Sequence, residues 1–270
     1  MVVEHGSTAN AKCRLMHASW AARTDPGFRR SQNEDCYVAR PEMGLFVVAD
    51  GMGGHAGGEI ASKIAVEAIA EAVEVTATLS AQDAWPLPFD ASVSRDANRL
   101  RAGFDLANRK IRERVIMMPA MRGMGTTAVA VLVGDETTTL AHVGDSRAYL
   151  YRSADLTRLT RDHSWVEEQV QTGALSETAA REHPWRNIVT RALSGDGVIE
   201  VELTELDLRL GDRVILCSDG LSSVLCDVEI SEIVSRHADL QTMCDDLVCV
   251  TNANGGPDNV TTVVLDINAG

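Results

Sequence analysis

One short segment limits the fold of this chain more than any other: the apolar run 45–49, which ends at Asp50 and leads into a glycine-rich turn. Residues 45–55 read Leu-Phe-Val-Val-Ala-Asp-Gly-Met-Gly-Gly-His. A short, continuous apolar run predicts a β-strand that is buried on both faces, and glycines let the backbone approach whatever lies at its end. The segment therefore predicts a buried strand that presents the Asp50 carboxylate to a site.

The same arrangement occurs twice more along the chain. The segment 214–218 leads into Asp219, and Asp258 follows Gly-Gly-Pro just before the apolar run 260–265. A single aspartate beside a glycine is common in ordinary turns. Three such carboxylates at the ends of apolar runs instead predict one shared cation site.

The composition narrows the class of protein. A chain of 270 residues with 45% hydrophobic content can bury a large core, and we favour one domain over two small ones. Phosphate backbones are bound by clustered Lys and Arg, so the net charge of −14 and the lack of such a cluster argue against a nucleic-acid partner. The acidic excess suits cation binding, although a soluble surface accounts for most of it.

The hydrophobic segments give no sign of a membrane or of secretion. No apolar run is long enough to cross a bilayer, and residues 1–14 lack the hydrophobic core of a signal peptide. We therefore predict a cytoplasmic protein with no membrane partner, in which residues 1–15 form a flexible N-terminal extension.

Helical and strand patterns occur in separate groups. Apolar residues at helical spacing predict two helices over 60–72 and 100–115, joined by a loop over 76–94. Short β-branched segments then predict an antiparallel meander. The segments are 126–133, 137–143, 147–151 and 156–160.

The remaining segments complete the pattern. Residues 164–183 are polar and helical, which predicts an excursion over the sheet edge and a candidate lid. Further strands are predicted over 16–23, 200–207, 213–218 and 260–265, and helices begin near Asp227 and Asp239, each with an acidic N-cap. Grouped strands and paired helices predict an α+β fold, a four-layer α-β-β-α sandwich of two mostly antiparallel sheets, with the carboxylates at one rim.

The carboxylates outnumber the needs of one ion. Mg²⁺ and Mn²⁺ prefer oxygen ligands, usually a few carboxylates with water in the remaining positions. Glu34, Asp35 and Asp145 bring the number of candidates to six. A carboxylate that bridges two cations about 4 Å apart explains the excess, and such pairs activate water for phosphoryl displacement.

Six short motifs occur in order and at suitable spacing, and together they resemble the metal-dependent type 2C protein phosphatases, the PPM family. The resemblance covers about residues 19–267, and the glycine-rich motif is similar to the bacterial branch. The motifs are Arg30-x-x-x-Glu34-Asp35, Asp50-Gly51-Met52-Gly53-Gly54-His55, Gly125-Thr126-Thr127, Gly144-Asp145-Ser146-Arg147, Ser218-Asp219-Gly220 and Asp258-Asn259.

The resemblance implies a set of metal ligands. Asp50 would bridge two Mn²⁺ or Mg²⁺ ions, with Glu34 and the Gly51 carbonyl on one ion and Asp219 and Asp258 on the other. Asp35 would act mainly through metal-bound water. Asp145, with Asp219, matches a third metal position. Residues 16–270 would then be a single phosphatase catalytic domain with a flap at about 161–191.

The same resemblance implies an activity. A metal-bridging hydroxide would attack the phosphorus of phosphoserine or phosphothreonine in a protein, with Asp50 and Asp219 as catalytic ligands. Arg30 would hold the phosphate, since a guanidinium donates to it bidentately. The expected partners are phosphorylated proteins and an opposing bacterial Ser/Thr kinase, and the protein is expected to be a monomer.

One position departs from the family pattern. Eukaryotic relatives carry a histidine directly after the Asp-Gly pair as the proposed proton donor, and this chain has Met52. His55 could donate that proton or could simply pack near the glycine loop, and a metal-bound water is a further candidate.

Three other functions fit parts of the sequence. Residues 51–56 match the GxGxxG/A pattern of dinucleotide-binding oxidoreductases, but Glu71 and Glu74 lie in or at the end of a helical pattern, not at the end of a second strand. A phosphatase-like binding module would be expected to lack metal carboxylates, and this chain keeps them. A phosphatase of another substrate, such as a partner-switching regulator or a small phosphoester, stays open.

Overall fold

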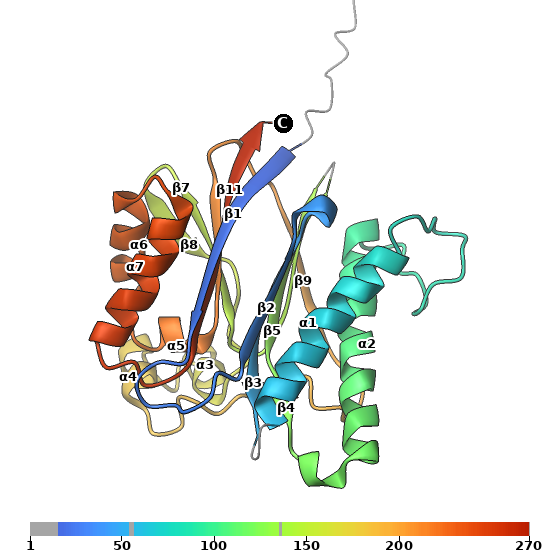
Figure 1. Cartoon of the computed structure of the whole chain (residues 1–270), viewed down its shortest axis with the longest axis horizontal. Coiled ribbons are helices and arrows are strands. Elements are labelled where there is room, and N and C mark those ends of the chain that lie inside the picture. Colours follow the sequence, from blue (N-terminus) through green and yellow to red (C-terminus); the bar gives the residue numbers. More distant parts are fainter. Residues whose placement is uncertain (1–15, 54–56, 135–136, 270) are drawn as a thin grey trace, which may run out of the picture.

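Two β-sheets pack face to face between two pairs of helices in a computed structural model of the protein (Figure 1). The structure describes residues 16–53, 57–134 and 137–269. The predicted extension 1–15 and His55 lie outside the described residues. This arrangement confirms the predicted four-layer α+β sandwich, and all strand pairings among the described residues are antiparallel.

The first sheet has the strand order β1-β11-β10-β7-β8. Its central strands β10 and β11 are apolar and buried, as continuous runs of Val, Ile and Leu favour. The strands are β1 (Met16–Asp25), β7 (Arg147–Arg152), β8 (Asp155–Arg158), β10 (Arg213–Cys217) and β11 (Val260–Ala269).

The second sheet has the order β2-β3-β5-β6-β9, and β4 also pairs with β3. Strand β3 contains the apolar run 45–49, whose five side chains are fully buried. The strands are β2 (Asp35–Arg40), β3 (Leu45–Met52), β4 (Gly125–Thr126), β5 (Ala128–Val133), β6 (Thr138–Val143) and β9 (Glu202–Leu206).

Helices cover the outer face of each sheet. Helices α1 (Gly57–Val75) and α2 (Arg95–Met117) pack on the second sheet, and α6 (Asp227–Arg236) and α7 (Leu240–Ala253) pack on the first (Figure 1). Apolar clusters fill both helix–sheet interfaces, and a third fills the space between the sheets. The fold therefore has three stacked cores, which hold the strand ends in fixed positions.

The predicted meander is wrong in one respect. The hairpin β5–β6 lies in the second sheet, whereas β7–β8 lies in the first, so the chain crosses between sheets at residues 144–146. Strand pattern alone carries no information on this crossing, because each hairpin has the same periodicity in either sheet. The crossing brings Asp145 to the boundary between the two sheets.

Smaller corrections concern element ends. Strand β3 continues beyond Asp50 to Met52, and β2 was not predicted as a separate strand. Asp239 is the N-cap of α7 as expected, but Cys226, not Asp227, caps α6, and the Glu229 carboxylate accepts from the Cys226 amide there. No helix of the described residues is long and apolar enough to cross a membrane.

The segment between β8 and β9 carries two short helices, α3 (Trp165–Gln171) and α4 (Glu177–Glu182). Serines cap both: Ser164 and Ser176 accept from backbone amides three residues later. The ends of the segment meet where Ser164 pairs with Val189. We call residues 161–191 the flap.

Candidate metal-binding active site

A cavity of about 250 Å³ opens at the end of the sandwich where the flap lies. Seven of the residues proposed from the sequence line it: Arg30, Glu34, Asp50, Gly51, Asp145, Asp219 and Asp258. Met52, Gly53, Thr127 and the flap residues Asn187 and Val189 complete the wall. Residues that are up to 228 positions apart in the sequence are thus brought to one place, the predicted rim.

Strand register sets two carboxylates against each other. Asp35 of β2 and Asp50 of β3 are directly opposite partners in the antiparallel pair. Like charges in that position destabilise a sheet. The sheet therefore accommodates a repulsion at this end that a bound cation would relieve.

Asp35 lies behind the cavity wall and is buried. Its Oδ2 accepts hydrogen bonds from the Ser218 and Thr261 hydroxyls, both at 2.7 Å, whereas its Oδ1 has no partner. Burial raises the pKa of Asp35 to about 7, against the opposing effect of the two hydroxyls. An unpartnered, buried carboxylate oxygen fits a role toward a cation or its water shell.

The other carboxylates repel one another in the same way. Burial first, and then the charges of neighbouring carboxylates, raises the pKa of Asp50 and of Asp145 well above the usual range. Burial likewise raises the pKa values of Asp219 and Glu34. Burial and mutual repulsion therefore destabilise the ionised forms of these carboxylates.

The glycines at this site allow close approach of backbone segments. A Cβ at Gly51 would lie 2.1 Å from the Gly58 carbonyl oxygen, and one at Gly58 would lie 2.7 Å from the Glu34 carboxyl carbon. The Gly51 amide also donates to the Glu34 carbonyl at 3.1 Å. Glycine is needed here because any side chain would push Glu34 away from the cavity.

Arg30 reaches the cavity from the loop before β2. Its guanidinium donates to Asp258 at 2.7 Å, and about half of the arginine side chain is exposed. The hydrogen bond to Asp258 raises the pKa of Arg30, so the group stays charged. Arg30 is the cavity's cationic side chain and faces the carboxylates from the solvent side.

Several supporting residues were not singled out from the sequence. The Asn259 amide donates to the Pro26 and Gln32 carbonyls and accepts from the Glu34 amide, all at 2.8–2.9 Å, and so ties down the loop 26–34. The Thr126 hydroxyl and the Thr127 amide both donate to the Asp50 carbonyl. These three residues lie in the motifs Asp258-Asn259 and Gly125-Thr126-Thr127, and membership of those motifs is the sequence feature that could have identified them.

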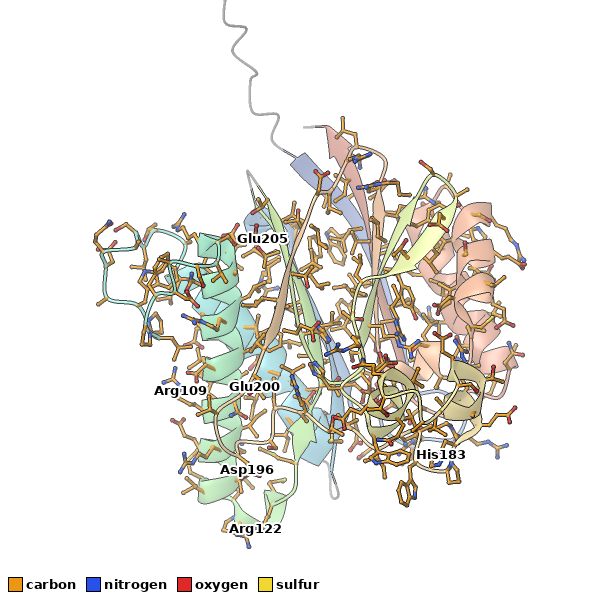
Figure 2. All side chains as sticks on the ribbon, turned by 180° about the vertical axis from the view of Figure 1, so that it is seen from behind. Arg109, Arg122, His183, Asp196, Glu200 and Glu205 are labelled. Carbon is orange, nitrogen blue, oxygen red and sulfur yellow. The ribbon has the colours of Figure 1, made fainter. Side chains whose placement is uncertain are left out.

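A second cavity of about 260 Å³ lies under the flap and shares Asp145, Asn187 and Asp219 with the first. In the wall of this cavity, the Arg147 guanidinium pairs with Asp162 at 2.6 Å. His183 marks the flap in Figure 2, on the opposite side of the molecule from Arg109 of α2. The two cavities are therefore adjacent.

The donor set fits divalent cations. The cavity offers several carboxylates and the Gly51 backbone, all oxygen donors of the kind that Mn²⁺ and Mg²⁺ prefer. Among the described residues that line it, none carries an imidazole or thiolate, the ligands typical of zinc. The unpartnered Asp35 oxygen and the raised pKa values are consistent with this. The antiparallel neighbours of β3 exclude the parallel βαβ unit of a dinucleotide-binding fold.

Residues 30–260 match the family described as protein phosphatase 2C. This chain belongs to that family. Protein phosphatase 2C members are hydrolases, and the chain's motifs follow the bacterial PPM branch, as the sequence predicted.

Individual relatives extend the match over nearly all of the chain. It is 40% identical over 248 residues to the serine/threonine protein phosphatase PstP of Mycobacterium tuberculosis, covering 92% of this chain but 45% of PstP, so it spans less than half of that protein. It is 35% identical over 259 residues to the serine/threonine phosphatase stp of Listeria welshimeri, covering 94% of this chain and 96% of stp.

A solved structure shows the same fold with metal. The catalytic domain of PstP in complex with two manganese ions superposes with a TM-score of 0.78, at 36% identity, over 94% of this chain and 99% of that one.

Proposed function

We propose that the chain is a divalent-metal-dependent protein phosphatase that hydrolyses phosphoserine and phosphothreonine in proteins and opposes a bacterial Ser/Thr kinase. The observation that carries the proposal is the cavity itself. Five carboxylates line it with one arginine, and a sixth, Asp35, lies behind it with an unpartnered oxygen. This concentration of negative charge has no counter-charge of equal size among the described residues.

The residues that would hold the cations follow from the lining. We assign Asp50, Glu34 and the Gly51 carbonyl to one ion, Asp50, Asp219 and Asp258 to the second, and Asp145 with Asp219 to a third. When bound, these cations supply an activated water as nucleophile and neutralise charge on the phosphoryl oxygens. Asp35 orients water at the rear of the site through its free oxygen.

Arg30 holds the substrate's phosphate. Its guanidinium stands at the mouth of the cavity and can donate two parallel hydrogen bonds to phosphate oxygens. The pairing with Asp258 keeps the arginine pointed at the site before substrate arrives. Met52 lines the wall and has no proton to donate, so we assign the leaving-group proton to His55 or to a water.

The cleft under the flap favours a protein substrate over a small phosphoester. It adjoins the carboxylate cavity and combines an apolar side, Val166, Val170 and Ala180, with Arg181 and Arg186. Neither arginine has an ion-pair partner among the described residues, whereas Arg158 pairs with Glu167 there. A peptide continuing from the phosphorylated residue would lie in this cleft. One chain supplies both cavities, so we propose that it acts as a monomer.

Hydrolysis of a phosphothreonine peptide by the chelator-treated protein, with and without added Mn²⁺, tests the proposal. We expect phosphate release that depends on Mn²⁺ or Mg²⁺ and disappears in excess chelator. Comparison with a generic aryl phosphate separates the chemistry from substrate choice: equal kcat/KM for the two would contradict a protein substrate. Undiminished release in chelator would contradict metal dependence.

A further inference from the structure

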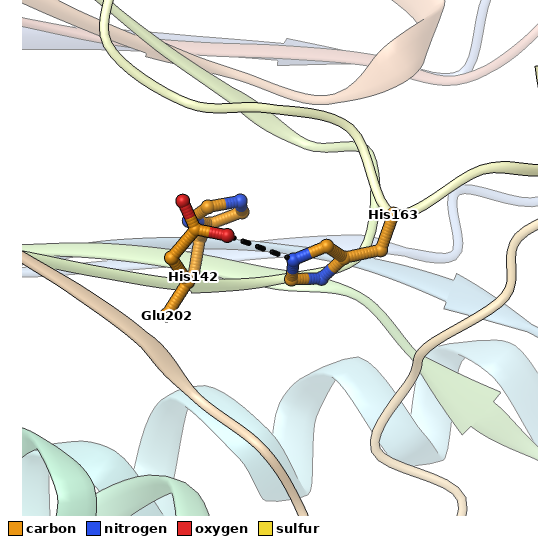
Figure 3. A group of neighbouring side chains, drawn as sticks. All are labelled: His142, His163 and Glu202. Atoms are coloured by element: carbon orange, nitrogen blue, oxygen red, sulfur yellow. Dashed lines mark hydrogen bonds and ion pairs between the residues drawn. The ribbon is translucent and has the colours of Figure 1, made fainter. Parts of the chain in front are cut away.

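His163, at the start of the flap, makes a set of buried contacts that the proposed chemistry does not use. Its ring stacks on that of His142 with centroids 4.7 Å apart, and its Nε2 lies 3.2 Å from a carboxylate oxygen of Glu202 (Figure 3). His142 of β6 and Glu202 of β9 are cross-strand partners, so their side chains share one face of the sheet. Both histidine side chains are almost fully buried.

Hydrogen bonds fix the tautomer of each ring. The Gly144 amide donates to His163 Nδ1 at 3.1 Å, so Nδ1 carries no proton and Nε2 donates to Glu202. His142 Nε2 lies 2.9 Å from the Arg161 carbonyl oxygen, which can only accept, so that Nε2 also carries its proton. Burial lowers the pKa of both histidines, which favours these neutral rings.

These tautomers argue against a metal ion at this trio. His163 has one nitrogen occupied as an acceptor and the other as a donor, so it has no lone pair left for an ion. The two rings are also nearly parallel, at 14°, and their in-plane lone pairs do not converge on one point. Instead, hydrogen bonds connect Glu202 through the His163 ring to the Gly144 amide.

Gly144 is held by His163 at both of its backbone groups. Its amide donates to the ring, and its carbonyl accepts from the His163 amide at 2.9 Å. Gly144 has a φ of 107°, and a Cβ there would lie 2.4 Å from the Thr127 Cβ, so the turn is tightly packed. Asp145, the next residue, lines the carboxylate cavity.

His163 also binds the backbone at the other end of the flap. The His163 carbonyl accepts from the Thr190 amide at 2.8 Å, next to the pairing of Ser164 with Val189. Val189 and Asn187 line the carboxylate cavity together with Asp145. His163 therefore contacts the backbone on two sides of that cavity.

We propose that His163 is a positioning residue of the phosphatase site, which accepts the Gly144 N–H at Nδ1 and thereby holds Asp145 and the returning flap segment 187–190 against the carboxylate cavity. The proposal rests on the proposed function. Groups that support metal ligands in this way typically change metal affinity or activity by 10–100-fold when replaced.

Two substitutions separate the two ends of the ring. His163→Asn places a carbonyl oxygen near the position of Nδ1 and can still accept from Gly144, whereas His163→Gln reaches the position of Nε2 and leaves Gly144 without an acceptor. Mn²⁺ binding to the chelator-treated proteins is measured by titration calorimetry, alongside kcat and KM for an aryl phosphate. We expect the Gln variant to lower both kcat and the affinity of the weakest Mn²⁺ site by about tenfold, with KM nearly unchanged. We expect kcat and Mn²⁺ affinity of the Asn variant to stay within about threefold of the wild type.

Two controls test which contact matters. Glu202→Gln keeps an acceptor for Nε2 and should leave Mn²⁺ binding unchanged. His237→Ala removes a similar histidine–carboxylate contact, 2.8 Å from Asp246, at the far end of α6, and should also leave it unchanged. Thermal unfolding in chelator shows whether each variant is folded at the assay temperature.

Equal losses in the Asn and Gln variants, or a Glu202→Gln loss as large as the Gln variant's, would overturn the proposal. A wild-type protein that binds Mn²⁺ but hydrolyses nothing would instead overturn the proposed function, and the binding comparison would still decide the role of His163.

Discussion

Two neighbouring groups of charged side chains in this protein are neutralised in different ways. Around Arg147, each charge has a protein partner: its guanidinium binds both oxygens of Asp162 at 2.6–3.1 Å and the Tyr149 hydroxyl at 3.1 Å. Around Asp50, carboxylates face carboxylates, and Arg30 reaches only Asp258. The first group is complete within the fold, whereas the second needs charge from outside. We therefore expect substitutions in the first group to change stability and substitutions in the second to change metal binding.

The largest expected effect is the loss of turnover when a carboxylate of the Asp50 group is replaced. Asp50→Asn and Asp219→Asn should each lower kcat for an aryl phosphate by about 1,000-fold, because several kcal/mol of charge stabilisation is lost. The same variants should unfold at a higher temperature than the wild type in chelator, since each removes a mutual repulsion. A lower unfolding temperature in chelator would mean that these carboxylates stabilise the fold.

Substitution in the Arg147–Asp162 group should instead destabilise the fold. Asp162→Asn leaves the Arg147 guanidinium buried without its charged partner, and side chains that are 15% and 10% exposed gain little from water. We expect a loss of about 3 kcal/mol in the free energy of unfolding, measured with urea. A loss below about 1 kcal/mol would show that Arg147 is neutralised elsewhere.

Arg30 lies between these cases, since it is half exposed and contacts one carboxylate. Arg30→Ala should raise KM for an aryl phosphate by about tenfold with a smaller change in kcat, because one charge-assisted contact to phosphate contributes about 1.4 kcal/mol. Arg109→Ala is the matched control, since Arg109 is a half-exposed arginine paired with Asp105 on α2, away from the cleft. If both variants change KM equally, Arg30 has no specific role.

The pH dependence of stability tests the Asp50 group a further way, through the buried carboxyl of Asp35. The folded pKa of Asp35 is about 7, above its value of 3.8 in the unfolded chain, so the folded state binds more protons between these values. Stability of the chelator-treated protein should therefore fall as pH rises from about 4 to 7, on the order of 1 kcal/mol per pH unit. Saturating Mn²⁺ should remove this fall, because metal binding favours the ionised carboxylates. A flat profile in chelator would show that Asp35 is ionised without metal.

Much of the fold and of the carboxylate site could be predicted from the sequence. Asp50 and Asp219 were visible at the ends of apolar runs, and Asp258 stood just before one. The helix pairs, the layers and the grouping at one rim followed from periodicity, because a core requires apolar faces at fixed spacing.

The remaining features depend on contacts between distant segments. The crossing between β6 and β7 could not be predicted, since either hairpin satisfies the same pattern in either sheet. The pairing of Asp35 with Asp50 depends on the β2–β3 register, and β2 is a mixed segment without a clear period. The acceptor role of His163 toward Gly144 could not be predicted, because it joins residues 19 positions apart.

Direct counting of bound Mn²⁺ tests the central claim, that the Asp50 group is completed by divalent cations. Equilibrium titration of the chelator-treated protein should show at least two Mn²⁺ ions per chain, with at least one lost in Asp219→Asn and none lost in Asp162→Asn. Failure to bind Mn²⁺, or the same number of ions in Asp219→Asn as in the wild type, would contradict the account.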